Sequence, residues 1–106
     1  MTKVFITPTC GLETTIIADA EDMQQVKVEV ESECAGIRKL ADALGGVNPF
    51  QEMSRRGEGP QILRLGREHC THMSCPVPAM MIKAVEVAAG MDLPKEVVIE
   101  WLDDTD

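Results

Sequence analysis

The stretch EHCTHMSCPVPAMMIKAVEVAAG, from Glu68 to Gly90, decides how the chain folds. Its second half, Val77 to Ala89, contains only two charged side chains, Lys83 and Glu86. A helix that is apolar on nearly every side is normally buried, so this segment is predicted to be the central helix of the core. A glycine just past the last helical residue is a frequent helix stop, and Gly90 is expected to end this helix.

The first half of the same stretch gathers side chains that bind metals. His69, Cys70, His72 and Cys75 fall within seven residues, directly before the predicted helix. Thiolates and imidazoles are preferred ligands of soft and borderline metal ions. This segment is therefore the first candidate for a functional site.

The N-terminal part of the chain predicts β-structure. From Gln25 to Glu31, three valines alternate with charged residues, which is the pattern of a strand with one buried and one wet face. Glu13 to Ala18 is rich in β-branched residues and is expected to pair with that strand as an antiparallel hairpin. A short strand is also expected from Lys3 to Ile6.

The middle of the chain predicts a helix directly after the hairpin. Ile37, Leu40 and Leu44 follow helical spacing. Ser32 is expected to be the N-cap of this helix, and the glycine pair that begins at Gly45 is expected to end it.

Two shorter helical segments are expected next. Asn48 should cap a helix from Pro49 to Arg55, because proline is favoured at the first helical position. Gln61 to Leu65 is expected to form one further helical turn. Ser74 is the expected cap of the central helix.

These elements together predict an α+β fold. Glu96 to Leu102 (EVVIEWL) reads as a last strand because β-branched and aromatic residues dominate it. The predicted sheet is antiparallel, with an N-terminal hairpin or meander plus this C-terminal strand, and it packs against the helices. A chain of 106 residues is expected to form a single domain, residues 1–106.

The composition excludes several classes of partner. The formal net charge of −8 disfavours nucleic acids and anionic membrane surfaces, which both favour a basic patch. No apolar run approaches the roughly 20 residues of a membrane span, and the N-terminus has no signal-peptide core. We therefore expect a cytoplasmic protein, in which thiols are normally reduced.

The four cysteines of the chain all fall in predicted turns or at the ends of predicted elements. Cys10 lies in a turn, Cys34 at a helix start, and Cys70 and Cys75 before the central helix. Structural cysteines usually lie inside a strand or helix as small apolar residues. We therefore expect these thiols to meet in one metal site. Scattered reduced cysteines, or two disulfides in an oxidising compartment, are the alternatives.

Other polar and sulfur-containing side chains near the cysteines have separate interpretations. His69 and His72 are alternate ligands, and Glu68 could orient a ligating histidine, although hydrogen bonds within the loop explain both histidines equally well. The methionines near the cysteines are expected to be packing residues: Met73, Met80 and Met81. A basic group is expected to be solvated or paired, with an anion site or stabilisation of thiolates as the alternative: Arg55, Arg56, Arg64 and Arg67.

The order of the cysteine motifs resembles two known families. Cys10-Gly11, Cys34 and His69-Cys70 resemble the iron–sulfur scaffold family of the IscU and NifU N-terminal type. In that family a Cys-Gly precedes a strand hairpin, a cysteine follows the hairpin, and His-Cys precedes the C-terminal helix. The second resemblance is to TSCPD-type cysteine-rich modules, which also occur at the end of some ribonucleotide reductases. It is carried by three motifs: Thr9-Cys10, Cys34-Ala35-Gly36, and Cys70 with Ser74-Cys75-Pro76.

These resemblances cover roughly Pro8 to Ala89. They imply a SufE/NifU-like α+β fold, with an antiparallel sheet under helices and a metal or cluster bound by the cysteines. Leu12 and Val77 replace the aspartates that the two families carry. The chain also looks like small uncharacterised proteins of anaerobes, which suits an oxygen-sensitive cluster.

The favoured function is a binding module in which four thiols hold Zn²⁺ or an iron–sulfur cluster, as a scaffold or accessory protein: Cys10, Cys34, Cys70 and Cys75. Four thiolates fill a tetrahedral site and leave no open position, which favours structure or electron transfer over hydrolysis. An unidentified protein partner is expected, and two chains could pair through the exposed edge of the last strand.

Three alternatives remain open. Cys34 or Cys70 could be an exchangeable thiol that carries sulfur or a cluster, with Cys75 as its partner. Cys70 could be a nucleophile with a neighbouring histidine as base, but the sequence offers no third residue for such an enzyme. A metal-free interaction protein is the remaining possibility.

Overall fold

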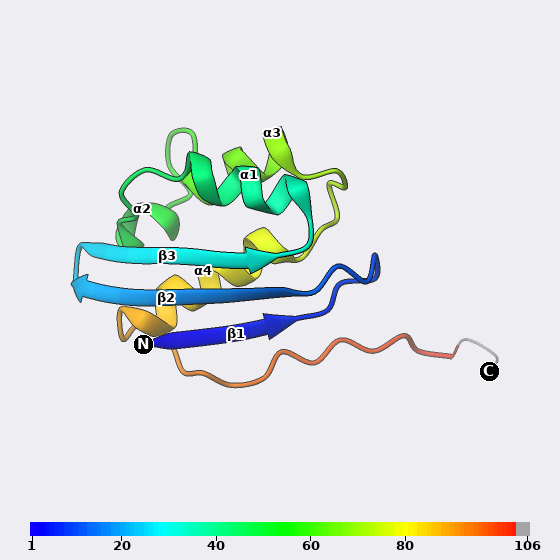
Figure 1. Cartoon of the computed structure of the whole chain (residues 1–106). Coiled ribbons are helices and arrows are strands. Elements are labelled where there is room, and N and C mark those ends of the chain that lie inside the picture. Colours follow the sequence, from blue (N-terminus) through cyan, green and yellow to red (C-terminus); the bar gives the residue numbers. More distant parts are fainter. Residues whose placement is uncertain (104–106) are drawn as a thin grey trace.

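The computed structural model describes residues 1–103 and shows the predicted α+β class (Figure 1). Its strands form one antiparallel sheet in the order β1-β2-β3. In chain order the elements are β1 (Thr2–Ile6), β2 (Thr14–Asp22), β3 (Gln25–Ser32), α1 (Ala35–Ala43), α2 (Pro49–Glu52), α3 (Gln61–His69) and α4 (Val77–Ala88).

The register of the sheet collects apolar side chains on one face. Val30 lies opposite Ile16, and Val28 lies opposite Ala18. Ile16 and Ala18 are fully buried, and the valines of β3 pack against the same core, as their alternation predicted. The other face carries the charged residues of β3 and stays in water, which an antiparallel sheet tolerates.

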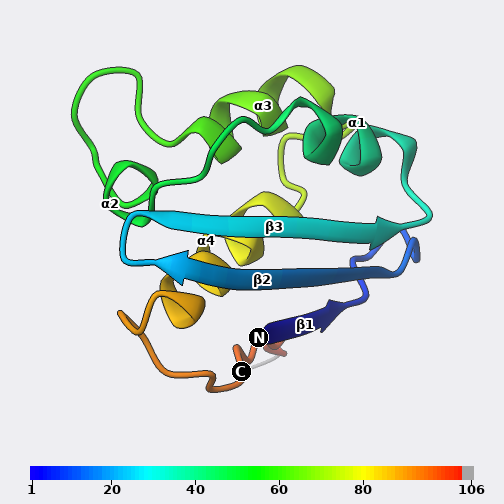
Figure 2. The same cartoon turned by 60° about the vertical axis from the view of Figure 1, so that its left-hand side comes forward.

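Helix α4 lies across the apolar face of the sheet and is the central helix, as predicted (Figure 2). It contacts all three strands, and Met81, Ala84 and Val85 are fully buried in these contacts. Gly90 ends the helix with a φ of 79°, and its N–H donates to the carbonyl of Val87 at 3.0 Å. No helix within residues 1–103 has both the length and the apolar character needed to cross a bilayer.

Helix α3 is longer than predicted, and a distant carboxylate caps its start. Pro60 occupies its N-cap position and offers no side-chain hydrogen bond. The carboxylate of Glu52, only 3% exposed, accepts the N–H of Gln61 at 3.0 Å and that of Ile62 at 2.8 Å. These two bonds satisfy amides that a helix start otherwise leaves unpaired. The helix then continues to His69, past the expected end at Leu65.

Two of the predicted N-caps are wrong. Cys34, and not Ser32, is the N-cap of α1. Ser32 instead closes the end of the sheet, because its hydroxyl bonds to that of Thr14 at 2.7 Å and accepts the N–H of Cys34 at 3.1 Å. Pro76, and not Ser74, is the N-cap of α4.

The predicted cap of α2 is confirmed. The side chain of Asn48 accepts the N–H of Phe50 at 2.9 Å. The helix itself is shorter than expected, since it ends at Glu52 and not at Arg55.

The predicted C-terminal strand is wrong. Residues 96–102 are extended, but within residues 1–103 they join no sheet. The segment runs alongside β1 in the same direction as that strand (Figure 1). Its apolar side chains remain largely in solvent, including Trp101 and Leu102.

Candidate functional site

Three of the four cysteines lie at the ends of three different helices. Cys34 is the N-cap of α1, and Cys70 is the C-cap of α3. Cys75 directly precedes Pro76, the N-cap of α4. All three side chains are half-buried and pack against the edge of the core. We call this group the thiol cluster.

A glycine contact brings α1 against the end of α3. A Cβ on Gly36 would lie 2.5 Å from the carbonyl oxygen of His69 and 3.4 Å from the Cα of Cys70. Contacts near 2.5 Å are far inside van der Waals distance, so no side chain fits at this position. Gly36 therefore allows the start of α1, with Cys34, to approach the end of α3, with Cys70.

A second glycine brings α3 against α4. A Cβ on Gly66 would lie 3.0 Å from the Cγ of Pro78, which is at the start of α4. The short α3–α4 connection is closed by its own backbone, where Cys75 N–H donates to the carbonyl of His72 at 3.2 Å. Through these contacts the ends of α3 and α4 lie together, which places Cys70 and Cys75 side by side.

The pKa of Cys70 is affected by the same neighbouring thiols. The pKa of the Cys70 thiol is raised from 9.0 to about 11, and burial is the largest cause. The smaller causes of the same shift are, in decreasing order, the charge of Cys75, a hydrogen bond with the Cys75 side chain, and the charge of Cys34. Crowded thiols resist ionisation because the resulting thiolates would repel one another. A bound cation would instead favour the thiolate form. Thiolates are preferred ligands of soft and borderline metal ions, so the cluster has the donor type for such an ion.

Cys10 lies at the same end of the sheet but is exposed. The pairing of Ile6 with Thr14 and of Thr14 with Ser32 places the β1–β2 connection beside the start of α1. Figures 1 and 2 both show this connection at the end where β3 enters α1. Cys10 is not among the groups that shift the pKa of Cys70. The structure thus brings three of the four predicted ligands together and places the fourth at the same rim.

The side chains of the thiol cluster are not arranged as a finished metal site. Within residues 1–103, no three cysteine, histidine or acidic side chains form a group with metal-binding geometry. The imidazole Nε2 of His69 lies 3.8 Å from the carboxylate of Glu68, and His72 is exposed.

The remaining polar and soft residues are distributed over the surface and the core. Arg64 pairs with Glu58 at 3.3 Å, which fits the expectation of surface pairing for that arginine. Met80 and Met81 pack in the core as predicted. The packing prediction for Met73 is wrong, because its side chain is 72% exposed.

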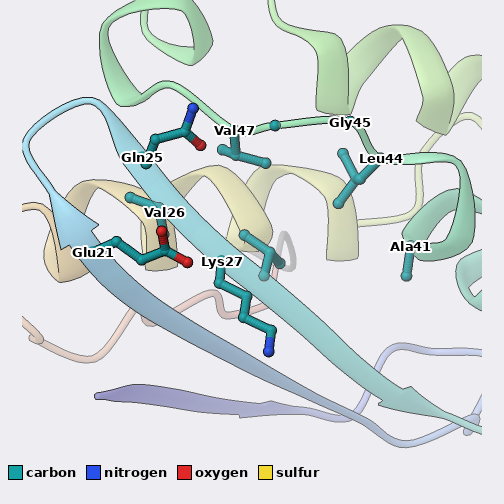
Figure 3. A pocket seen from close by; sticks show the side chains of 10 residues that line it. Glu21, Gln25, Val26, Lys27, Ala41, Leu44, Gly45 and Val47 are labelled. Carbon is teal, nitrogen blue, oxygen red and sulfur yellow. The ribbon is translucent and has the colours of Figure 1, made fainter.

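A shallow pocket lies at the opposite end of the sheet (Figure 3). Its volume is about 270 Å³, and it lies between the β2–β3 hairpin and the segment after α1. Lys27 and Glu21 are its charged lining residues, and both are exposed. It contains none of the cysteines or histidines and is separate from the thiol cluster.

Fold and site together define a small α+β protein with thiols at a junction of three helices. The chain belongs to the family of unknown function DUF6951, which matches residues 2–101. No curated protein and no solved structure matches the chain. The resemblance to iron–sulfur scaffolds and to TSCPD-type modules therefore rests on the cysteine motifs alone.

Proposed function

We propose that this chain is a small metal- or iron–sulfur-binding module, acting as a scaffold or accessory protein. The thiols of Cys34, Cys70 and Cys75 would hold the metal, and Cys10 would supply the fourth thiol from the β1–β2 connection. The observation that supports this most directly is the convergence of three thiols from three separate helix ends.

The backbone around the cluster supports a binding role. A close helix contact that only Gly36 permits fixes the spacing between Cys34 and Cys70. The hydroxyl pair of Thr14 and Ser32 ties the start of α1 to the sheet. A site whose ligands come from packed elements loses less entropy on binding than one built from free loops. A bound zinc ion or cluster would link the sheet end to all three helices and supply stability or a redox centre.

The raised pKa of Cys70 argues against two alternatives for the metal-free chain, a free-thiol carrier and an enzyme with Cys70 as nucleophile. A pKa of about 11 leaves roughly one thiol in 10⁴ ionised at pH 7. A carrier or an enzyme that uses Cys70 as a free nucleophile needs a larger thiolate population than that. The exchangeable-thiol function remains the second candidate, because the hydrogen bond between Cys70 and Cys75 marks them as a close pair.

Metal analysis of anaerobically purified protein tests the proposal. We expect about one zinc per chain in a colourless protein, or iron and sulfide in a brown one. Replacement of zinc by Co²⁺ gives thiolate charge-transfer bands, whose intensity reports the number of bound thiols. A metal-free protein that also takes up no Co²⁺ and no iron under reducing conditions would contradict the proposal.

Single substitutions then identify the ligands. Cys75→Ser is expected to lower metal retention and the melting temperature of the loaded protein, because it removes a thiol from the cluster. Cys10→Ser tests whether the exposed cysteine is the fourth ligand. Ser74→Ala is the matched control, since Ser74 is exposed in the same connection and has no thiol. Equal metal content in Cys75→Ser and Ser74→Ala would remove Cys75 from the site.

A further inference from the structure

Among residues 1–103, the outer edge of β1 and the apolar C-terminal segment are two features that pair with no other strand. Within the described residues, β1 pairs with β2 alone, so its other edge presents free backbone groups. Residues 96–102, here called the tail, are extended but belong to no sheet. Exposed sheet edges and unpaired extended segments are complementary, because each supplies the backbone partners that the other lacks.

An open groove of about 800 Å³ separates the tail from the body of the protein. β1 forms one wall, the outer side of α4 forms another, and the tail borders it. Its lining is predominantly apolar, and Met80 and Val87 of α4 contribute to it. A groove of this kind next to a free strand edge suits an added β-strand with apolar side chains.

The tail has the side-chain pattern of such a strand. Val97, Ile99 and Trp101 alternate along it and border the groove, yet they are 54%, 82% and 95% exposed. The chain's own tail therefore does not close its own groove. Exposed contiguous apolar side chains of this kind mark interaction surfaces in soluble proteins.

An ion pair and a hydrogen bond hold the backbone between α4 and the tail. The ammonium group of Lys83 pairs with the carboxylate of Asp92, which also accepts the N–H of Leu93 at 2.7 Å. From this point the tail runs in the same direction as β1 (Figure 1). Pairing within one chain would therefore be parallel, which is the less stable arrangement, in a sheet that is otherwise antiparallel. A second copy related by a two-fold axis can present its tail antiparallel to β1.

We propose that two copies of this chain form a dimer by exchanging tails, each tail pairing with the β1 edge of the other copy. A two-fold axis makes the contact self-complementary, since every copy offers one edge, one groove and one tail. The exchange buries the side chains of Ile99 and Trp101 in the partner's groove and leaves no β1 edge open. The inference does not depend on the thiol cluster, because none of the cysteines lines the groove.

The mass of the 106-residue chain in solution gives the first test. Sedimentation velocity over a range of concentrations is expected to show two copies of the 11.6 kDa chain in reversible equilibrium with one. Trp101 is the only tryptophan, so its fluorescence reports the tail directly. Its emission should shift to the blue, and its quenching by acrylamide should fall, in step with dimer formation.

A pair of matched substitutions locates the interface. Ile99→Asp places a charge in the groove and is expected to weaken the dimer by about 30-fold or more. Val98→Asp, its neighbour, does not border the groove, so it should change the dissociation constant by less than about threefold. Both positions are largely exposed in the single chain, at 82% and 69%, so both variants should fold. Circular dichroism verifies this.

Each other outcome overturns the proposal. A monomer at all concentrations with a shielded Trp101 would mean that the tail pairs with its own β1. A monomer with an exposed Trp101 would mean that the tail does not bind a second copy of this chain. A dimer that both substitutions dissolve, or that neither dissolves, would have a different interface.

Discussion

Two regions of the molecule differ in how far their apolar and sulfur-containing side chains are buried. The first is the junction of α1, α3 and α4, and the second is the edge of β1 with the neighbouring tail. At the junction, Gly36 lies so close to the backbone of α3 that no side chain fits there, Gly66 is in tight contact with Pro78, and the half-buried thiols pack against the edge of the core. At the edge, Ile99 and Trp101 border a groove and remain more than four-fifths exposed. The pattern of residues predicts which segments favour burial, but the partner is set by the backbone geometry.

The largest effect that can separate the two regions is expected at Gly36. Gly36→Ala forces a Cβ to within 2.5 Å of the carbonyl oxygen of His69, and this neighbour is backbone, so it cannot rotate away. We expect a loss of about 3 kcal/mol in the free energy of unfolding, measured by urea denaturation. The same change should weaken metal uptake, because it separates Cys34 from Cys70.

Gly45→Ala is the matched control for this prediction. A Cβ there would meet only the side-chain oxygen of Gln61, at an ordinary 3.5 Å. We expect a change within about 0.5 kcal/mol. If both alanine variants denatured at the same urea concentration as the wild type, the close contact at Gly36 would not contribute to the free energy of unfolding.

The sequence predicted the parts of the fold that depend on local pattern. The alternating valines of β3 identified the buried face, the nearly uncharged run from Val77 identified the central helix, and Gly90 identified its end. These features depend on periodicity and on conformational preference, which neighbouring residues reveal.

The features that the sequence did not reveal depend on distant residues. Glu52 caps a helix that begins nine residues later, and no local sequence motif predicts that hydrogen bond. Gly66 lies inside α3, where glycine lowers helix propensity, and its reason is the contact with Pro78 of another helix. The tail has strand composition, but composition does not supply a pairing partner, and so the predicted strand is not formed within residues 1–103.

The thiol cluster was partly predicted from the sequence. Loop and helix-end positions predicted that the cysteines would meet, and Cys34, Cys70 and Cys75 do lie at one junction. The position of Cys10 relative to them depends on how the β1–β2 connection folds, which short motifs do not determine.

A smaller effect is expected from the ionisation of Cys70. In the metal-free, reduced protein, the thiol of the unfolded chain loses its proton near pH 9.0, whereas the folded chain keeps it until about pH 11. The unfolded state is therefore favoured as the pH rises through this interval, and the free energy of unfolding falls. Because the group is partly solvated, we expect a total decrease of about 1 kcal/mol, well below the full linkage value.

The dependence is isolated by comparison with Cys70→Ser. Urea denaturation from pH 8 to pH 11 gives the two profiles, and their difference removes the contribution of other titrating groups. Below pH 9 the difference should be constant, and it should then shrink as the pH rises, because only the wild type loses this contribution. Parallel profiles over the whole range would show that Cys70 titrates normally and that the thiols are not crowded.

The smallest effect is expected in the tail, and it completes the contrast between the two regions. Ile99→Ala removes the same atoms as Ile62→Ala, but Ile99 is 82% exposed and Ile62 is fully buried. At protein concentrations low enough to keep the chain monomeric, we expect Ile99→Ala to change the free energy of unfolding by less than about 0.5 kcal/mol. Ile62→Ala, measured in the same way, should cost about 3 kcal/mol because it leaves a cavity in the core. If Ile99→Ala cost as much as Ile62→Ala in the monomer, the tail would be part of the core of its own chain, and its apolar side chains would need no second copy to bury them.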